Sequence, residues 1–217
     1  MKNNNIFTPP EQFHKKLIDK YGPNSSEAVL WHSAGLQCAA FADLLQYISL
    51  QDGFSVLDVG AGKCDLYGFL ESRIVVDSYV GVDRSVDLLK IGHSNYPNIK
   101  TIAGDYAEID VESMVLFDLV IANGSLPYVK MYHGRKKQLA MFKQIVTKMF
   151  LQTRRYCAFN IYSPLLSKVT GDDPKSWFMI EGQELLELVS SLTPRFIIDH
   201  SSRSGYVNVI LYHNVIV

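Results

Sequence analysis

The sequence predicts an α/β protein with a doubly wound, mostly parallel sheet and helices on both faces. Three observations favour this class. Short β-branched segments alternate with helical segments from residue 53 onward. The first strand runs directly into a glycine turn that opens a helix. The last two strands are joined by residues 201–205, which is too short for a parallel crossover, so the last strand must run antiparallel to its neighbour.

The expected elements follow in chain order. An N-terminal helical extension, predicted to act as a lid, covers residues 1–52, and one compact domain covers 53–217. The extension has helices at 10–21 and 26–48, the second because apolar residues recur every three or four positions. The predicted strands of the domain are 54–59, 79–83, 99–103, 117–122, 156–162, 195–200 and 206–212. Its predicted helices are 66–70, 85–91, 135–151 and 181–192.

Composition excludes several classes of protein. The chain has 217 residues, 47% of them hydrophobic, which is enough to bury a core without a disulfide or metal staple. No segment approaches 18 uncharged apolar residues, and the start lacks the apolar region of a secretory signal. Three widely spaced cysteines argue against a disulfide framework and a zinc site. We therefore expect a cytoplasmic protein with no metal and no membrane partner, and the oligomeric state stays open.

One part of the chain is distinctly basic. Residues 119–171 hold nine lysines and arginines and no acid, whereas the rest carries 12 positive and 22 negative charges. Such a segment can attract phosphates, so a docking surface over 130–155 is one interpretation. The other is the solvated face of a helix together with strand ends. The second is favoured, because the predicted helix from Arg135 would lie on the outer face of the sheet.

The strongest functional motif is the predicted strand, turn and helix around Gly60 and Gly62. Glycines let the backbone approach a ligand closely, and a helix N-terminus presents unpaired N–H groups. The next predicted strand ends in Asp83, 21 residues beyond Gly62, where a carboxylate can accept both hydroxyls of an adenosine ribose. Together these features predict a cofactor that contains a nucleoside.

Later residues narrow the choice of cofactor. Three positions after Gly62, where a dinucleotide-binding fingerprint has glycine, stands Asp65, whose carboxylate would repel a pyrophosphate. Asp105 follows the third strand, where a carboxylate can accept the adenine amino group, and Asn123 ends the fourth strand. The sequence therefore favours a less anionic nucleoside cofactor over a nicotinamide dinucleotide.

With these motifs in this order, the sequence resembles the class I S-adenosylmethionine-dependent methyltransferases over nearly the whole chain. More narrowly, residues 13–21, 65–68, 158–160 and 192–195 look like a bacterial and phage group of stand-alone methyltransferase-domain proteins without a firmly assigned substrate. The resemblance implies a Rossmann-like, seven-stranded sheet. It also implies a transferase with S-adenosylmethionine bound across the carboxyl ends of the strands.

The resemblance assigns roles at the methionine end of that cofactor. Gly60, Ala61 and Gly62 would line it, with Asp58 beneath. Asn123 would offer its backbone carbonyl to the cofactor's amino group.

The resemblance also assigns roles at the nucleoside end. Asp83 would hold the ribose hydroxyls, Arg84 would flank the adenine, and Asp105 with Tyr106 would read the adenine edge. One departure is Cys64, which stands where the family usually has a third glycine. We interpret Cys64 as a buried packing residue rather than a reactive thiol.

Catalysis needs little from the protein beyond position. Methyl transfer from a sulfonium is an in-line displacement, and a general base helps only where the acceptor holds a proton of high pKa. Three side chains are weak candidates for that base: Tyr128, Tyr162 and His32. Each is explained at least as well as a pocket wall or an ordinary packed or surface residue, so the catalytic residue stays unknown.

The predicted acceptor is small or peptide-like. About 18 residues, 163–180, separate the fifth strand from the last helix, and with the N-terminal helices they suggest an apolar lid. The loop after the fourth strand lacks the prolines and aromatic residue of amino-methylating DNA enzymes, and Cys157 lies inside a predicted strand, so DNA methylation is not expected. Two alternatives stay open: an RNA or protein methyltransferase that docks through 130–155, and a non-catalytic, cofactor-binding partner subunit.

Overall fold

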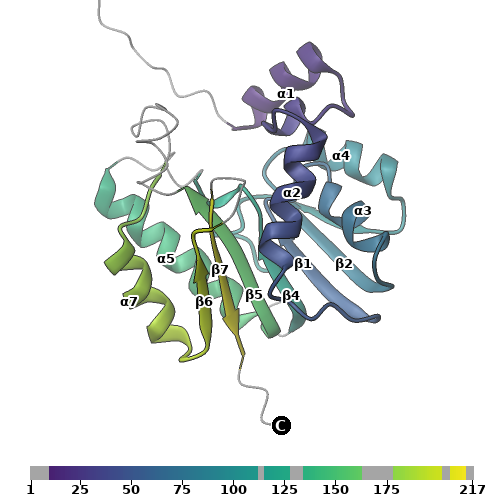
Figure 1. Ribbon diagram of the computed structural model, residues 1–217. Helices are drawn as coiled ribbons and strands as arrows, with labels where there is room; N and C mark the ends of the chain where they lie inside the picture. Colours follow the sequence, from purple (N-terminus) through teal and green to yellow (C-terminus); the bar gives the residue numbers. More distant parts are fainter. Residues whose placement is uncertain (1–9, 112–114, 128–133, 163–177, 202–205, 214–217) are drawn as a thin grey trace, which may run out of the picture.

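The computed structural model describes residues 10–111, 115–127, 134–162, 178–201 and 206–213. Within these ranges seven strands form one sheet in the order β3-β2-β1-β4-β5-β7-β6 (Figure 1). The strands are β1 (Phe54–Val59), β2 (Val76–Asp83), β3 (Lys100–Ala103), β4 (Phe117–Ala122), β5 (Thr153–Tyr162), β6 (Phe196–Asp199) and β7 (Tyr206–Tyr212). The helices are α1 (Pro10–Tyr21), η1 (Glu27–Val29), α2 (Ala34–Leu45), α3 (Asp65–Glu71), α4 (Val86–Asn95), α5 (Arg135–Leu151) and α7 (Gly182–Leu192).

The sheet confirms the predicted fold class. β7 runs antiparallel to both β5 and β6, and the other neighbouring strands are parallel. The short connection after β6 therefore joins two antiparallel strands, as its length requires. Five elements, β1, β4, β7, α1 and α5, have the predicted bounds.

The prediction of one helix over residues 26–48 is wrong. The chain forms η1, leaves helical geometry at Leu30, and starts α2 only after Ser33. Leu30 has a left-handed backbone (φ 66°), which an α-helix cannot continue through. Ser33 is extended, and its hydroxyl accepts the N–H of Leu36 at 3.2 Å, so it is the N-cap of α2. The apolar positions with helical spacing, Leu36 to Ile48, all follow this break, so they indicated α2 but not where it begins.

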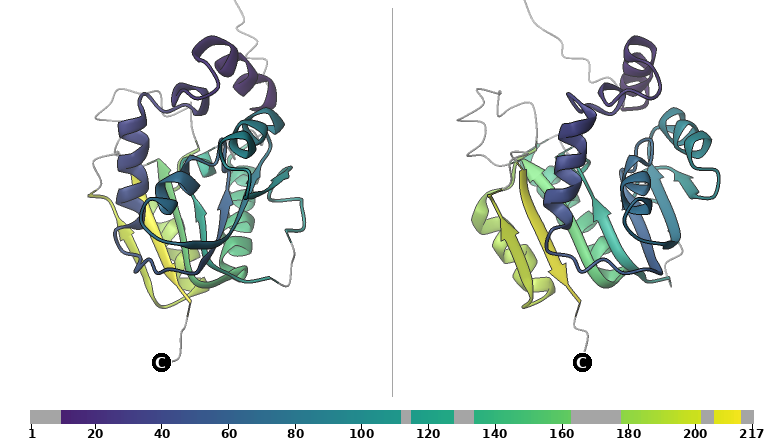
Figure 2. Two further views of the ribbon diagram at one scale, coloured as in Figure 1. Left: turned by 90° about the vertical axis from the view of Figure 1, so that its right-hand side faces the viewer. Right: turned by 45° about the vertical axis from the view of Figure 1, so that its right-hand side comes forward.

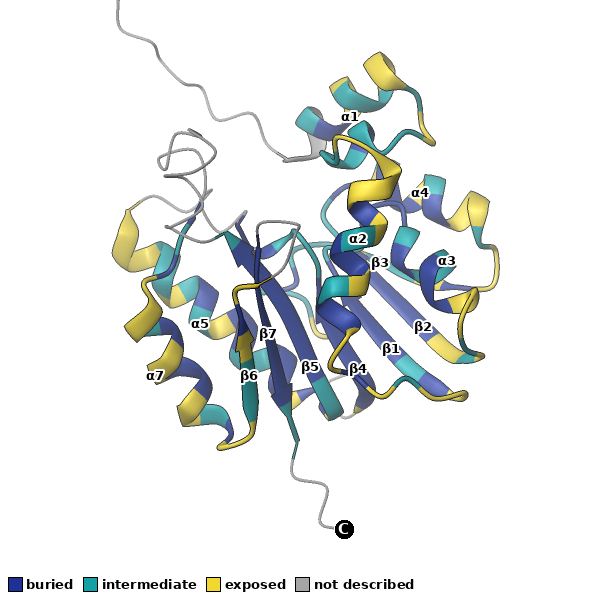
Figure 3. Ribbon diagram, in the orientation of Figure 1, coloured by how far each residue is buried: buried dark blue, intermediate teal, exposed yellow. Residues whose placement is uncertain are grey.

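Two layers of helices bury the two faces of the sheet (Figure 2). On one face α5 and α7 pack through Phe142, Val146 and Val189. On the other, α2, α3 and α4 pack through residues that include Leu44 and Leu70. The central strands between these layers are almost wholly buried (Figure 3). The edges of the sheet are formed by β3 and β6, which have four residues each.

Several properties of the described residues bear on the class of protein. No helix among them is long and apolar enough to cross a membrane. Among the same described residues, no group of three or more His, Cys, Asp or Glu is placed to hold a metal ion. The three cysteines are free, Cys38 exposed and Cys64 and Cys157 buried.

The extension formed by α1, η1 and the start of α2 lies beyond the carboxyl ends of β1 and β2 (Figure 1).

Candidate functional site

A cavity of about 450 Å³ lies at the carboxyl ends of the parallel strands. Its volume falls in the range of small-molecule sites, roughly 300–1,000 Å³. It is lined by all nine residues that the sequence predicted for a cofactor: Asp58, Gly60, Ala61, Gly62, Asp83, Arg84, Asp105, Tyr106 and Asn123. The extension contributes His14, Trp31 and His32, and Tyr162 and Tyr206 line the part formed by β5 and β7.

The glycine turn is shaped by close contacts with other segments. Gly60 and Gly62 both have positive φ, 78° and 55°. A Cβ on Gly60 would come within 2.1 Å of the Ser125 Cβ, and one on Gly62 would come within 3.1 Å of Val29 Cγ1. Ser125 also donates its hydroxyl to the carbonyl of Val59 at 2.7 Å. The glycines therefore bring the turn against the β4 loop and the extension, in addition to leaving backbone open to the cavity.

Cys64 has the backbone that explains why glycine is usual there. Its φ and ψ are 58° and 32°, in the left-handed region. The side chain is fully buried, and its Sγ lies close to the backbones of Gly81 and Gly92, where an added Cβ would be 3.1 and 2.9 Å away. Burial raises the pKa of the Cys64 thiol. A buried, neutral thiol fits a packing role and not a nucleophile.

Asp83 joins the end of β2 to the glycine turn. Its Oδ2 accepts the N–H of Gly62 at 2.9 Å, and its Oδ1 accepts the N–H of Ser85 at 2.7 Å. Burial raises the pKa of Asp83, and these two hydrogen bonds oppose that shift. A carboxylate has about four lone-pair positions, so Asp83 can accept further hydrogen bonds from a ligand.

Asp105, Arg84 and Tyr106 form the far end of the cavity. Arg84 pairs with Asp105 at 3.0 Å, and the other carboxylate oxygen of Asp105 accepts the N–H of Ala107 at 2.9 Å. The hydroxyl of the buried Tyr106 donates to Gln152 Oε1 at 2.6 Å. This hydroxyl is thus engaged with a core side chain, and the carbonyl of Tyr106 accepts from Lys148 Nζ at 2.5 Å, so both of these oxygens are held by other residues of the chain.

Asn123 offers a polar atom that the sequence did not point to. Its Oδ1 accepts from Asn160 Nδ2 at 2.5 Å, and Asn160 Oδ1 in turn accepts the N–H of Gly124 at 2.6 Å. The Nδ2 of Asn123 is buried and has no hydrogen-bond partner within the described ranges. Buried donors are usually satisfied, so this amide is suited to an acceptor atom of a bound molecule. The sequence predicted only the backbone carbonyl of Asn123 as a ligand contact.

Asp58 lies beneath the turn as a buried carboxyl group. It is 3% exposed, and the hydroxyl of Tyr79 donates to its Oδ2 at 2.5 Å. Burial raises the pKa of Asp58 to about 7; the Tyr79 hydrogen bond opposes that shift, and the charges of Asp83 and Asp65 add to it. Asp58 therefore changes charge close to neutral pH.

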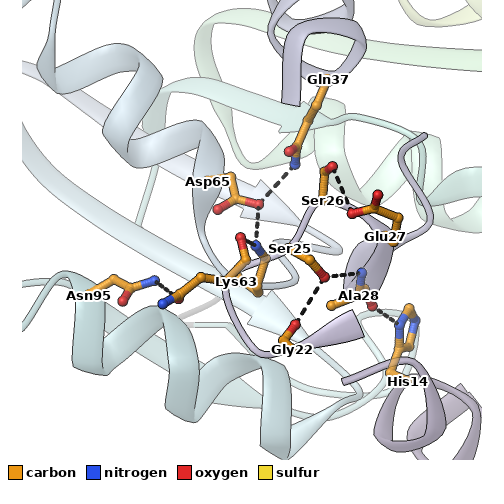
Figure 4. Close-up of polar contacts among 11 residues, drawn as sticks. His14, Gly22, Ser25, Ser26, Glu27, Ala28, Gln37, Lys63, Asp65 and Asn95 are labelled. Atoms are coloured by element: carbon orange, nitrogen blue, oxygen red, sulfur yellow. Dashed lines mark hydrogen bonds and ion pairs between the residues drawn. The ribbon is translucent and has the colours of Figure 1, made fainter. Parts of the chain in front are cut away.

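A polar network fastens the extension to the glycine turn (Figure 4). Lys63 is only 3% exposed, and its Nζ lies 3.4 Å from Asp65 Oδ2 and donates to the carbonyl of Asn24 at 3.2 Å. Gln37 of α2 donates to the same oxygen of Asp65 at 2.9 Å. The network therefore ties both ends of the extension's loop to the residues that follow Gly62.

His14 of α1 is a cavity residue that the sequence did not predict. Its Nδ1 lies 3.0 Å from the carbonyl oxygen of Ala28 (Figure 4), so this nitrogen carries the proton and donates it. No sequence motif marks His14, because it reaches the cavity through the packing of α1 on η1.

The candidate catalytic residues are placed differently from one another. Tyr162 and the exposed His32 line the cavity, whereas Tyr128 lies outside the described residues. Tyr206, which the sequence did not single out, also lines the cavity. It is the register partner of Tyr162, and the two hydroxyls are 3.1 Å apart. Knowledge of both strands was not enough to find this pair, since their register was unknown.

Three basic residues of the 119–171 segment form ion pairs with acidic residues of the same chain. Arg154 and Arg155 pair with Asp118 at 3.2 and 3.4 Å. Arg135 at the start of α5 pairs with Glu184 of α7. These contacts support the interpretation of the segment as a helix face and strand ends.

The sheet order and the position of the cavity define the class I S-adenosylmethionine-dependent methyltransferase fold. The solved structures that share it include the following three. The N-methyltransferase NodS from Bradyrhizobium japonicum, in complex with S-adenosylhomocysteine, aligns with a TM-score of 0.67 at 11% identity, over 94% of this chain and 97% of NodS. CalS10 of Micromonospora echinaspora, an amino pentose methyltransferase with bound S-adenosylmethionine, gives 0.60 at 13% identity over 82% and 90%. Magnesium protoporphyrin IX methyltransferase of Synechocystis, with bound S-adenosylmethionine, gives 0.56 at 15% identity over 83% and 80%.

Sequence comparison finds a distant relative. Over 100 residues the chain is 20% identical to a protein of Invertebrate iridescent virus 6 named "Putative methyltransferase 235L". The match covers 45% of this chain and 36% of the viral protein, so the chain spans about a third of that relative. No family model matches the chain.

Proposed function

We propose that this protein is an S-adenosylmethionine-dependent methyltransferase that transfers a methyl group to a small or peptide-like acceptor by in-line displacement. The observation that carries the proposal is the convergence of all nine predicted cofactor residues on one cavity at the carboxyl ends of the strands. Ligands bind at that edge in open, parallel α/β sheets. Similar folds have been solved with S-adenosylmethionine or S-adenosylhomocysteine bound, which supports the same ligand here.

The residues around the cavity fit the chemistry of this cofactor. S-adenosylmethionine carries a sulfonium and an ammonium group, and the described cavity wall has four carboxyl groups against one guanidinium: Asp58, Asp65, Asp83 and Asp105 against Arg84. Asp83 would accept the ribose hydroxyls with its remaining lone pairs. The Nδ2 of Asn123, which has no hydrogen-bond partner among the described residues, would donate to the cofactor's carboxylate. The glycine turn leaves room for the methionine portion.

When bound, the cofactor supplies an activated methyl group, so this chain's residues have to bind, orient and exclude water. His14, Trp31 and His32 of the extension form a roof over the cavity. From the predicted division into 1–52 and 53–217, we keep as part of the proposal a lid made of α1, η1 and the start of α2, since the rest of α2 packs on the sheet of the methyltransferase domain. Tyr162 and His32 remain the described candidates for a general base, and Tyr128 a further one.

Calorimetric titration of the purified protein tests the proposal. S-adenosylmethionine and S-adenosylhomocysteine should bind with micromolar affinity, and NAD should give no heat. Binding of NAD alone would overturn the choice of cofactor. If none of the three binds, the chain would instead be a non-catalytic subunit of the same fold.

A further inference from the structure

We propose that the acceptor is an amine, held as its ammonium form against an aromatic wall made by Trp31, Tyr162 and Tyr206. The inference rests on the proposed function and names the substrate class of that site. It starts from the part of the cavity that the predicted cofactor residues do not line.

The three aromatic side chains form one continuous wall. Tyr162 of β5 and Tyr206 of β7 are register partners, with ring centroids 4.9 Å apart and an interplanar angle of 30°. Trp31 of the extension packs on Tyr206 with centroids 5.8 Å apart. All three line the cavity. The wall thus combines two strands of the sheet with the extension that covers them.

The position of the wall suits an acceptor. In the sheet, the predicted nucleoside residues follow β3 and β2, the glycine turn follows β1, and the wall lies at β5 and β7. The Trp31 ring also contacts the β4 loop, because a Cβ on Gly124 would be 3.4 Å from its Cζ2. Gly124 follows Asn123, which is proposed to hold the methionine end. The wall therefore lies on the methionine side of the proposed cofactor position, away from the residues proposed to bind the nucleoside.

Charge favours an amine over an anion at this wall. Even with Asp58 protonated, three carboxylates line the described cavity. Arg84 pairs with Asp105 and Lys63 pairs with Asp65, which leaves an excess of one negative charge, at Asp83. The resulting negative potential attracts cations and repels carboxylates and phosphates. Aromatic ring faces attract ammonium groups, with about 0.5–2 kcal/mol per contact. A neutral alcohol would gain from neither effect.

The proposed step balances without a further reactant. The ammonium first loses one proton to water, which frees the nitrogen lone pair. The N–CH₃ bond then forms as the S–CH₃ bond breaks, and the bonding pair returns to sulfur to give a neutral thioether. The methylated ammonium can then release an N–H proton to water.

Matched probes test the inference by binding and not by turnover. The protein saturated with S-adenosylhomocysteine is titrated at pH 7 with benzylamine, benzyl alcohol and benzoate, which share a ring and differ in charge. Benzylamine should bind about tenfold more tightly than benzyl alcohol, as expected for one or two cation–π contacts. Benzoate should show no binding. Equal binding of the amine and the alcohol, tighter binding of benzoate, or no binding by any probe would overturn the inference.

Variants of the wall residues test whether benzylamine binds at the wall. Trp31→Leu and Tyr206→Leu should each weaken benzylamine binding about fivefold, while affinity for S-adenosylhomocysteine stays within twofold. Tyr21→Leu is the control, because Tyr21 is an exposed tyrosine of the same extension and does not line the cavity. Trp31 is part of the extension, so its variant remains informative if Tyr206→Leu fails to fold. Unchanged benzylamine binding in Trp31→Leu would overturn the assignment of the aromatic wall as the amine site. Failure of S-adenosylhomocysteine to bind the unmodified protein would instead overturn the proposed function.

Discussion

The carboxylate of Asp83 accepts the backbone N–H of Gly62 at 2.9 Å, which makes the end of β2 and the glycine turn of β1 one hydrogen-bonded unit. A residue proposed to bind ribose thus also holds the loop proposed to bind methionine. The two proposed roles of Asp83 are measured separately, one as cofactor affinity and the other as stability.

Asp83→Asn keeps one oxygen that can accept a hydrogen bond, whereas Asp83→Ala removes both. We expect Asp83→Ala to lower S-adenosylhomocysteine affinity by about 100-fold, since two hydrogen bonds to a charged group contribute about 3 kcal/mol together. It should also lower the free energy of unfolding by about 1–2 kcal/mol, because the N–H groups of Gly62 and Ser85 lose their acceptor. Calorimetry and urea unfolding measure the two effects. A folded Asp83→Ala protein with unchanged affinity would remove the ribose assignment.

The raised pKa of Asp58 predicts that the stability of the ligand-free protein depends on pH. Its folded-state pKa of about 7 lies above the unfolded value, so the folded state binds more protons between about pH 4 and 7. This contribution is fully present below the unfolded pKa and is lost as pH rises through 7. Compared with Asp58→Asn, the natural protein should therefore lose stability from pH 5 to 7 and level off above about pH 8. Thermal unfolding of both proteins across that range measures the difference, and parallel curves would contradict it.

Tyr79→Phe provides a second test of the same site. It removes the 2.5 Å hydrogen bond that lowers the Asp58 pKa. The pH range over which stability is lost should therefore move upward. When Tyr79→Phe is combined with Asp58→Asn, this loss of stability should be absent. A downward shift would mean that the hydroxyl does not stabilise the charged carboxylate.

Lys63→Met should loosen the extension from the glycine turn. The substitution removes the buried ammonium that joins Asp65 to the carbonyl of Asn24. Breaking a largely buried pair leaves its partner unsatisfied, and because Asp65 is 24% exposed we expect a loss of about 1–3 kcal/mol. Hydrogen exchange should become faster in residues 24–37 and stay unchanged in β4. Lys90→Met removes the same charge from an exposed position of α4 and serves as the control. Equal exchange in both variants would contradict the tether.

Cys64 predicts an unusual order of stability among small residues. Cys64→Gly loses a buried thiol but gains a backbone that adopts φ 58° without a Cβ penalty of about 1–2 kcal/mol. Cys64→Ala loses the thiol and keeps the penalty. We therefore expect Cys64→Gly to be the more stable of the two by about 1 kcal/mol, with cofactor affinity retained, as measured by urea unfolding and calorimetry. A large loss of affinity in Cys64→Gly would reveal a role of the thiol beyond packing.

The sequence was informative where one local rule decides the outcome. The short runs of mostly apolar residues in β1 and β4, the glycine turn, and the short link before β7 each have one solution, so the sheet could be predicted. The positions of Asp83, Asp105 and Asn123 followed from the same logic, because the carboxyl ends of parallel strands meet at one edge.

Other features depend on tertiary contacts that no local pattern records. The helix predicted over 26–48 is broken at Leu30, whose left-handed backbone is set by the packing of η1 and not by a local pattern. The pairing of Tyr162 with Tyr206 depends on strand register, and the hydroxyl of Tyr106 is engaged by Gln152 in the core. Each of these required knowledge of which segments lie side by side.

The most direct test of the account is a crystal structure of the protein with S-adenosylhomocysteine. The proposed function predicts ribose hydroxyls within hydrogen-bond distance of Asp83, adenine beside Arg84 and Asp105, and the sulfur facing the wall of Trp31, Tyr162 and Tyr206. A ligand bound outside the cavity, or with its ribose away from Asp83, would contradict the proposed function.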